Sequence, residues 1–589
     1  MPARRRLRLD ARRCRAGRVA VRWPLRPCRI KRYERALITI VNLASAAAVA
    51  HFTQEHQAVA GNERNQAMEG NKRLCIVGAG ISGLVACKHA VEKGLQPTVF
   101  EASAGVGGVW ARTLWSTRLQ STSSTFRFTD HPWPPSVTEA HPDHSQVMDY
   151  LQSYAHHFDL MRWVRFVAKV VSLEFVGVEE EEVVERWERW SGNGEAFGDG
   201  RGVWRVTVEV SGKQEPEIYE FDFVVLCIGR FSGTWRIPEF PDNGGPRIFN
   251  GMTMHSMDFS ELDRATAAEL IRGRKIIVVG SGKSALDITA ECARLNGENQ
   301  PCTMIYRSKK WILDNVSPCG LDIGYICSNR FRELLLHKPC EGFLKNLVPV
   351  LLSPLRWVIS KALDTYYSLK LPLRKHGILP SYSAYDAIST CSFSTAPSNF
   401  FEMVESKCII LKEIKSFRFC PSGILINDER EYVHADLVIF ATGFEGDLKI
   451  KRLFHSRCFQ EIVLNASNNM AVPLYRHCIH PRIPQLAVLG YADSFSTLFT
   501  SEMMSKWLAC LLEGSFQLPT IKEMEKDVLK WVEFTKMYRR KPLRWTCVQA
   551  SNIWYNDQLC KDMGCNPKRK TGFLLEWFQP YGPADYTYM

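Results

Sequence analysis

Two stretches of the chain repeat one local pattern, an apolar strand that runs directly into a glycine-rich turn and then a helix. The first comprises Lys72–Val77 (KRLCIV), the turn GAGISG and a helical pattern at Leu84–Lys93, which Gly94 ends. Pro97–Glu101 (PTVFE) follows as a second strand. Because the order is strand, turn, helix and strand, the segment predicts a βαβ unit with parallel strands.

The same pattern recurs near Arg274, where KIIVVG precedes GSGKSALDITAECARL and Thr303–Tyr306 (TMIY) supplies the next strand. A glycine turn between the first strand and helix of such a unit is typical of dinucleotide-binding domains. The sequence therefore predicts an α/β fold with two Rossmann-like dinucleotide-binding domains.

The first glycine turn has the residue types that hold a dinucleotide pyrophosphate. Gly78 permits the tight turn, Gly80 lets the phosphate approach the backbone, and Gly83 lets the helix pack on the sheet. The positive end of the helix faces the phosphate charge. Glu101 ends the second strand, where a carboxylate accepts hydrogen bonds from ribose hydroxyls. The residues predicted to bind FAD in this unit are Gly78, Ala79, Gly80, Ile81, Ser82, Gly83 and Glu101.

A second glycine-rich turn, GVGGVW, lies a few residues after Glu101. It either presses against the bound FAD or is a simple surface loop. We include Gly108, Val109 and Trp110 among the candidate FAD-binding residues.

The second unit favours NADPH. Its turn carries Ala285 in place of the third glycine, which the fingerprint tolerates. The following strand ends in YRSKK rather than in an acid, and a basic end suits a 2′-phosphate. Arg307 is the strongest phosphate candidate, because guanidinium binds phosphate with two parallel hydrogen bonds; the alternative is a solvated basic turn. The predicted NADPH-binding residues are Gly280, Ser281, Gly282, Lys283, Ser284, Ala285 and Arg307.

Charge and cysteine content exclude other classes. Of the net charge of +13, residues 1–67 carry +11 and the rest of the chain +2, so a nucleic-acid partner is not indicated. The 19 cysteines show no spacing typical of zinc ligands, and we predict no metal site. Scattered cysteines are typical of reduced thiols, which favours a cytoplasmic protein.

Residues 1–67 read as a non-globular extension. An Arg-rich segment precedes the apolar stretch Ala36–Ala50, which is too short to span a bilayer. The extension is an organellar or ER targeting segment, a membrane anchor, or upstream sequence before a true start at Met68, which we favour. The apolar segment Gly342–Leu363 forms either a packed helical subdomain or a peripheral membrane contact, and we expect no transmembrane span.

Two further motifs carry a resemblance to a known family. Phe249, Gly251, His255 and Phe259 fit FxGxxxHxxx[YF], and Ala441–Gly443 is an ATG motif within FATGF. With these motifs the chain resembles the flavin-containing monooxygenases from Lys72 to its C-terminus. The segments LLSPLRW, WYNDQLCKDMG and PYGPADY resemble the plant, pathogen-response branch of that family.

The resemblance implies that the NADPH domain is inserted into the FAD domain. Residues 68–229 and 441–589 then form the FAD domain, and residues 230–440 form the NADPH domain with a helical insertion at about 312–400. The ATG motif links the second domain back to the first, which places Thr442 beside FAD.

The resemblance also implies the reaction. NADPH reduces FAD, O₂ forms a flavin C4a-hydroperoxide, and a nucleophilic N or S of a small molecule takes one oxygen in a dry pocket. Such activity is typified by N,N-dimethylaniline monooxygenation, and N-hydroxylation of a pipecolate-like amino acid in plant defence is the favoured substrate chemistry. Thioether S-oxygenation, an auxin-type decarboxylation and a non-catalytic FAD-binding protein are the alternatives.

Two residues have roles that follow from the resemblance alone. Many family members have Asn at the position of Gln120, beside the flavin and NADP⁺, and Gln keeps the carboxamide. Gln120 is thus the candidate catalytic residue, with Ser121 beside FAD and Leu119 beside NADPH. His255 is expected to shape the segment between the domains and not to transfer a proton.

Overall fold

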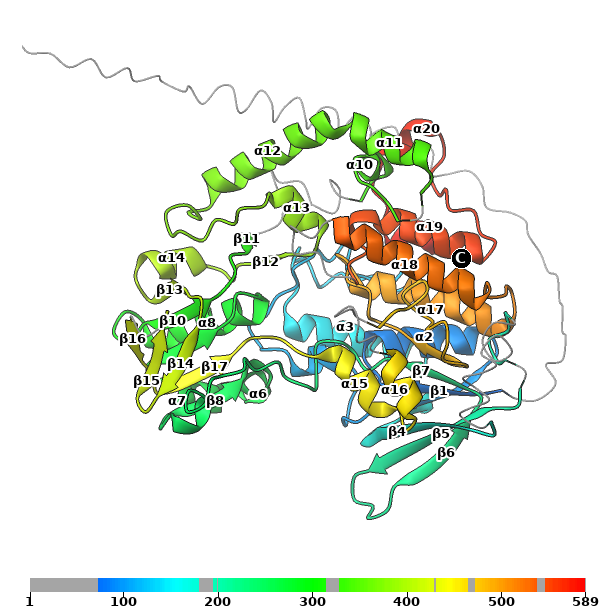
Figure 1. Ribbon diagram of the computed structural model, residues 1–589, viewed down its shortest axis with the longest axis horizontal. Helices are drawn as coiled ribbons and strands as arrows, with labels where there is room; N and C mark the ends of the chain where they lie inside the picture. Colours follow the sequence, from blue (N-terminus) through cyan, green and yellow to red (C-terminus); the bar gives the residue numbers. More distant parts are fainter. Residues whose placement is uncertain are drawn as a thin grey trace, which may run out of the picture. The chain divides into compact units, whose positions relative to one another are not determined.

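The computed structural model describes residues 72–178, 194–198, 200–313, 328–339, 341–427, 431–463, 472–537 and 546–587. The predicted extension at residues 1–67 lies outside these ranges. So does most of residues 179–201, an acidic, Gly-rich stretch whose composition predicts a surface loop or hairpin insertion. The described residues build two separate five-stranded sheets, each with a glycine turn and helix at its centre (Figure 1).

The first sheet has the order β18-β7-β1-β2-β3, and all its strand pairs are parallel. The predicted βαβ unit is β1 (Arg73–Val77), α2 (Ile81–Glu92) and β2 (Gln96–Phe100). The other strands are β3 (Val164–Arg165), β7 (Phe223–Leu226) and β18 (Leu486–Val488). The central strands are almost wholly buried, because helices cover one face of the sheet and the antiparallel strands of residues 168–221 cover the other.

The second sheet has the order β13-β10-β9-β17-β8 and is also parallel. Its βαβ unit is β9 (Ile276–Val279), α8 (Lys283–Asn296) and β10 (Cys302–Tyr306). The remaining strands are β8 (Met252–His255), β13 (Ile409–Glu413) and β17 (Leu437–Phe440). Since β18 of the first sheet follows all of these strands, the second domain is inserted into the first, and the predicted fold class is confirmed.

Smaller sheets accompany each domain. The strands β4 (Ala168–Val176), β5 (Val203–Val210) and β6 (Glu217–Phe221) form an antiparallel meander in the first domain, and the acidic stretch connects β4 with β5. In the second domain β14 (Phe417–Cys420), β15 (Gly423–Ile426) and β16 (Glu431–His434) form another. A parallel pair joins β11 (Trp311–Leu313) to β12 (Phe393–Thr395).

Helices cover the sheets and build the insertion. The insertion contains α10 (Arg330–Leu334), α11 (Phe343–Leu351), α12 (Ser353–Lys370) and α13 (Ala384–Ser389). The C-terminal part contains α17 (Thr497–Glu513), α18 (Ile521–Met537), α19 (Asn552–Asp562) and α20 (Phe573–Phe578). The others are α3 (His144–His157), α6 (Ser256–Glu261), α7 (Arg264–Ile271), α14 (Phe400–Glu405), α15 (Gly446–Leu453) and α16 (Arg457–Val463).

The core of the first domain lies where α17 packs on α2. Helix α17 reads TLFTSEMMSKWLACLLE, and nearly all of its residues are buried, because it contacts α2 on one side and α19 on another. In the described part of the chain no helix is long and apolar enough to cross a membrane.

Candidate functional site

A cavity of about 800 Å³ lies at the carboxyl ends of β1 and β7. Its wall contains seven of the residues predicted to bind FAD: Gly78, Gly80, Ile81, Ser82, Glu101, Gly108 and Val109. Other lining residues come from segments distant in the sequence, including Arg112, Arg230, Lys449, Gly490 and Asp493. Ligands of open parallel sheets bind at this end of the strands, so the position agrees with the predicted dinucleotide site.

Glycines are required where the two turns of this cavity meet. Gly78 has φ +103°, and a Cβ on Gly83 would lie 1.8 Å from the Gly78 carbonyl oxygen. Gly108 has φ +57°, and a Cβ there would lie 2.9 Å from the Cα of Gly80. The GVGGVW turn therefore packs directly against the first glycine turn, which favours its assignment to the site over a simple surface loop.

Glu101 holds the glycine turn in place. Its carboxylate is buried and accepts hydrogen bonds from the backbone N–H of Ala79 at 2.7 Å and of Ser103 at 2.8 Å. Each carboxylate oxygen has a second lone pair, so the group can still accept from ribose hydroxyls. The predicted ribose acceptor is thus also a structural support of the turn.

Some predicted FAD-binding residues do not line this cavity. Ala79 and Gly83 lie within the turn, and Trp110 packs on Phe126 with ring centroids 6.2 Å apart. The Thr442 hydroxyl donates to the Arg236 carbonyl oxygen in the segment that leaves the first domain.

Gln120 also lies outside the lining of the cavity. Its Oε1 accepts a hydrogen bond of 3.2 Å from the backbone N–H of Thr395 in β12. Its neighbours Leu119 and Ser121 are buried. The structure therefore places Gln120 where the FAD domain meets the insertion of the NADPH domain.

The second glycine turn packs against the ATG motif. Gly280 has φ +147°, and a Cβ there would lie 2.4 Å from the Ala441 carbonyl oxygen. Ala285 is fully buried beneath the turn, whereas Ser284 is exposed. The Ala441 N–H in turn donates to the Val279 carbonyl oxygen at 2.9 Å.

A buried carboxylate connects this turn with the first domain. Lys283 Nζ donates to Asp287 Oδ1 at 2.7 Å, and Thr117 Oγ1 donates to Asp287 Oδ2 at 2.7 Å. Burial raises the pKa of Asp287, and the Lys283 ammonium opposes that shift. Thr117 lies only a few residues before Gln120, so the segment expected near the flavin is bonded to the helix of the NADPH turn.

The basic end of β10 contains one exposed arginine and two half-buried lysines. Arg307 is exposed, whereas Lys309 pairs with Glu413 at 3.0 Å. Lys310 Nζ lies 4.0 Å from the position that a Cβ on Gly282 would take. Lys310, which the sequence marks only as part of a basic run, therefore reaches toward the glycine turn.

His255 connects the two family motifs. The Met257 N–H donates to His255 Nδ1 at 3.2 Å, which leaves the proton on Nε2 to donate to the Gly443 carbonyl oxygen at 3.2 Å. The ring is buried and stacks on Trp235 with centroids 5.5 Å apart. Burial lowers the pKa of His255, which favours the neutral ring that these two hydrogen bonds require.

The two phenylalanines of the motif, Phe249 and Phe259, are buried in core clusters of the second domain. A Cβ on Gly251 would lie 2.3 Å from the Phe249 ring, so only glycine fits there. Phe249 packs on Phe419 at 5.4 Å between centroids, and Phe259 packs on Trp115 of the first domain at 6.3 Å.

The two segments that connect the domains run antiparallel and share hydrogen bonds. Arg236 N–H donates to the Gly443 carbonyl oxygen and Glu445 N–H to the Thr234 carbonyl oxygen, both at 2.9 Å. Lys449 in α15 adds a third contact, because its Nζ donates to the Ile228 carbonyl oxygen at 2.7 Å.

Lys449 is a cavity residue that the sequence did not single out. Burial, and secondarily the Arg112 guanidinium, lower its pKa to about 8. The only sequence signal is its position shortly after the ATG motif, in the first helix of the returning chain.

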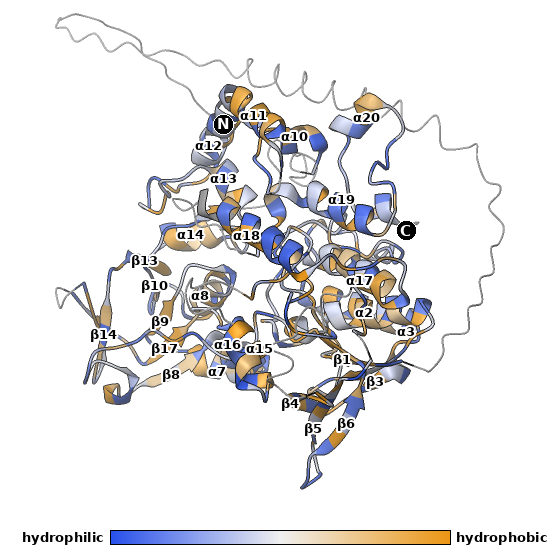
Figure 2. Cartoon of the chain, turned by 45° about the vertical axis from the view of Figure 1, so that its right-hand side comes forward, coloured by the Kyte–Doolittle hydropathy of each residue, from blue (hydrophilic) through white to orange (hydrophobic). Residues whose placement is uncertain are grey.

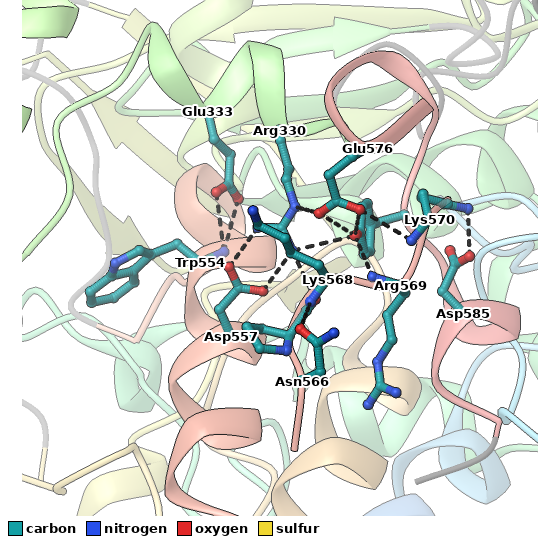
Figure 3. A network of polar contacts seen from close by, with 12 residues as sticks. Arg330, Glu333, Trp554, Asp557, Asn566, Lys568, Arg569, Lys570, Glu576 and Asp585 are labelled. Atoms are coloured by element: carbon teal, nitrogen blue, oxygen red, sulfur yellow. Dashed lines mark hydrogen bonds and ion pairs between the residues drawn. The ribbon is translucent and has the colours of Figure 1, made fainter. Parts of the chain in front are cut away.

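A polar network joins the insertion to the C-terminal segment (Figure 3). Arg330 in α10 donates to Asp557 Oδ1 at 3.0 Å and pairs with Glu576 at 2.5 Å. Glu333 accepts from the Ile553 N–H at 2.7 Å. Asp557 belongs to WYNDQLCKDMG, and Arg330 also donates to the Tyr581 hydroxyl of PYGPADY at 3.4 Å, so both segments take part in the contact with the insertion.

Comparisons with known proteins agree with this geometry. The family model described as flavin-binding monooxygenase-like matches residues 71–577. The probable flavin-containing monooxygenase 1 of Arabidopsis thaliana is 38% identical over 524 residues, which are 88% of this chain and 96% of the relative.

Solved structures share the fold. The S-allyl-L-cysteine S-oxygenase of Allium sativum superposes with a TM-score of 0.52 at 19% identity, over 84% of this chain and 89% of that one. OTEMO in complex with FAD and NADP superposes with a TM-score of 0.55 at 15% identity, over 84% of this chain and 98% of that one.

Proposed function

The chain belongs to the flavin-binding monooxygenase-like family and is an FAD- and NADPH-dependent monooxygenase, and we propose that it oxygenates a nucleophilic nitrogen or sulfur of a small molecule. The observation that carries the proposal is the cavity built from two touching glycine turns, with Glu101 beneath it, in a domain bonded to the NADPH unit through Thr117 and Asp287. Bound FAD, reduced by NADPH, supplies the activated oxygen.

The protein's own residues would bind and orient the cofactors. We assign FAD to the 800 Å³ cavity and its lining residues, with Lys449 and Arg112 as cations facing it. We assign NADPH to the turn at Gly280–Ala285, with Arg307 and Lys310 toward its 2′-phosphate. The FAD domain is then residues 68–229 and 441–589, around the NADPH domain at residues 230–440.

The favoured substrate is a pipecolate-like cyclic amino acid, hydroxylated on nitrogen. Similarity to a plant flavin-containing monooxygenase and the plant-branch segments support it. S-oxygenation of a thioether is the second candidate, which the fold shared with an S-oxygenase supports. Oxygen transfer to either atom needs positioning in a dry pocket more than acid–base side chains.

The substrate proposal is tested with purified full-length protein, FAD, NADPH and a panel of cyclic amino acids, amines and thioethers. We expect one hydroxylated product per NADPH consumed for the amino acid. A product from thioethers alone, with amino acids only increasing H₂O₂, would replace the first candidate by the second.

We also propose that the enzyme is cytoplasmic and makes a peripheral contact with anionic lipid. Helices α11 and α12 are apolar yet largely exposed: Phe343 is 82% and Leu369 83% exposed. Together with α20 they lie along one edge of the described chain (Figure 1, Figure 2). Further exposed apolar side chains on this edge are Leu344, Val350, Leu351, Trp357, Val358, Phe573, Leu574 and Phe578.

The charges on α11 and α12 indicate which kind of partner this edge contacts. Helices α11 and α12 carry Lys345, Arg356, Lys361 and Lys370 against one acid, Asp364, which already pairs with Lys361 at 3.7 Å. An apolar surface with basic rims is typical of interfacial helices. The protein should sediment with phosphatidylserine vesicles and less with phosphatidylcholine vesicles, and the double change Phe343→Ser and Leu344→Ser should weaken binding. Equal recovery with and without vesicles would contradict the proposal.

A further inference from the structure

Two cysteines from distant parts of the sequence meet beside the FAD domain. Cys391 follows α13 in the insertion, and Cys547 lies in the segment before α19. Their Sγ atoms are 3.2 Å apart. A disulfide requires a separation of about 2.05 Å, so an approach of about 1.2 Å would complete the bond.

The surroundings of the pair suit oxidation. Cys391 is half-buried and so open to a small oxidant, whereas Cys547 is 2% exposed. Cys391 also has φ +52°, a backbone conformation that residues other than glycine rarely adopt and that recurs at functional positions.

The domain core supplies a contrasting pair. Cys292 in α8 and Cys302 in β10 are also in contact through their thiols, but both are fully buried. Since thiol oxidation requires access as well as proximity, this second pair should resist oxidants that reach Cys391.

We propose that Cys391 and Cys547 form a reversible disulfide when hydrogen peroxide reaches the site. The Cys391 thiolate attacks one peroxide oxygen, the O–O bond breaks, and the departing hydroxide takes up a proton as water. The Cys547 sulfur then attacks the sulfur of the resulting sulfenic acid. The S–O bond breaks, and the second hydroxide leaves as water with the Cys547 proton. Two thiols lose two electrons in total, and one peroxide becomes two waters.

The oxidant is one that this family's chemistry releases. A flavin monooxygenase whose activated oxygen is not transferred to substrate gives hydrogen peroxide instead. Only this source of hydrogen peroxide rests on the proposed function. The oxidation of the two thiols is tested separately, with added peroxide and no NADPH.

The disulfide would join the insertion to the wall of the FAD cavity. Thr546, next to Cys547, donates through Oγ1 to Asp493 Oδ2 at 2.8 Å, and the Asp493 N–H donates to the Thr546 carbonyl oxygen at 2.7 Å. Asp493 lines the cavity. A bond between residues 156 positions apart also restricts the unfolded chain strongly, so the oxidised protein should melt several degrees higher.

The test uses the full-length holoenzyme treated with hydrogen peroxide, alkylated, digested without reductant and analysed by mass spectrometry. We expect a peptide pair linked through Cys391 and Cys547 that dithiothreitol separates, and a higher Tm that the same reductant reverses. Cys391→Ser and Cys547→Ser should each abolish both effects, whereas Cys302→Ser should keep them.

Two results would overturn the proposal. One is peroxide-treated wild-type protein in which Cys391 is oxidised to sulfinic acid but no linked peptide forms. The other is linkage of Cys292 to Cys302 at the same rate, which would mean that access does not select the pair. Because both readings come from the wild-type protein, a variant that fails to fold does not affect the decision.

Discussion

The replacement Glu101→Gln separates support of the glycine turn from recognition of the ribose. Glu101 accepts from two backbone N–H groups, Ala79 at 2.7 Å and Ser103 at 2.8 Å, in a buried position. Glutamine has one acceptor oxygen, so its NH₂ group must face one of these N–H donors. That donor loses its partner and stays buried.

The expected cost follows from the hydrogen bonds. A bond to a charged group contributes about 1.5–3 kcal/mol, and a buried unpaired N–H costs about 1–3 kcal/mol. Together these effects give a net loss of about 3 kcal/mol, because the acceptor of the hydrogen bond that remains is no longer charged. If the turn must be ordered to bind FAD, this loss weakens the Kd for FAD about 100-fold.

The assay is titration of the apoprotein with FAD by flavin fluorescence, with urea unfolding of the apoprotein beside it. Glu405→Gln is the matched control, because Glu405 makes an exposed ion pair with Lys375 at 2.6 Å, neither residue lines the cavity, and FAD affinity should change little. A Kd within threefold of wild type for Glu101→Gln would refute the reasoning. Weaker FAD binding with unchanged apoprotein stability would assign Glu101 to the ribose alone.

Three further changes test other parts of the site. Arg307→Ala should raise KM for NADPH at least tenfold and leave KM for NADH unchanged, because only NADPH carries the 2′-phosphate; equal effects would remove the assignment. Burial lowers the pKa of Lys449 to about 8, so its positive charge is lost as the pH rises from 7 to 9. The affinity for FAD should therefore fall over that pH range, and Lys449→Met should abolish this pH dependence. Burial lowers the pKa of His480 to about 4, so the unfolded chain binds a proton that the native state excludes. Native stability should therefore fall as pH drops from about 6.5 to 4 in urea titrations, and less steeply in His480→Gln.

The elements with local signals could be predicted from the sequence. Each βαβ unit combines an apolar strand, glycines and an amphipathic or buried helix within about 30 residues, and both formed where expected. The roles of Gly78, Gly80 and Gly83 also follow from local geometry, because a side chain at these positions would meet the backbone of the same unit or its neighbour.

The residues that tertiary contacts bring together were beyond prediction. Lys449 reaches the Ile228 carbonyl oxygen across 221 positions, and Gln120 meets Thr395 across 275. No periodicity encodes such pairs, since they depend on how the inserted domain returns to the first. The polar network around Arg330 is likewise invisible in the sequence, although two of its partners, Asp557 and Tyr581, lie in segments that mark the plant branch.

The exposed edge at α11 and α12 illustrates a different limit. The sequence predicted helices here, and they form at 343–351 and 353–370. Hydropathy alone left open whether their apolar side chains pack inside or face outward. The structure leaves most of them exposed, so the property to be identified is the partner that covers them.

The central claim is that this chain transfers one atom of O₂ to a nucleophilic nitrogen or sulfur through FAD and NADPH. The most direct measurement is turnover of pipecolate, with thioethers beside it, under ¹⁸O₂ with NADPH in excess of enzyme. The account predicts a product that contains one ¹⁸O atom for each NADPH oxidised, with little H₂O₂. NADPH oxidation that ends entirely in H₂O₂ for every amine, amino acid and thioether supplied would contradict it.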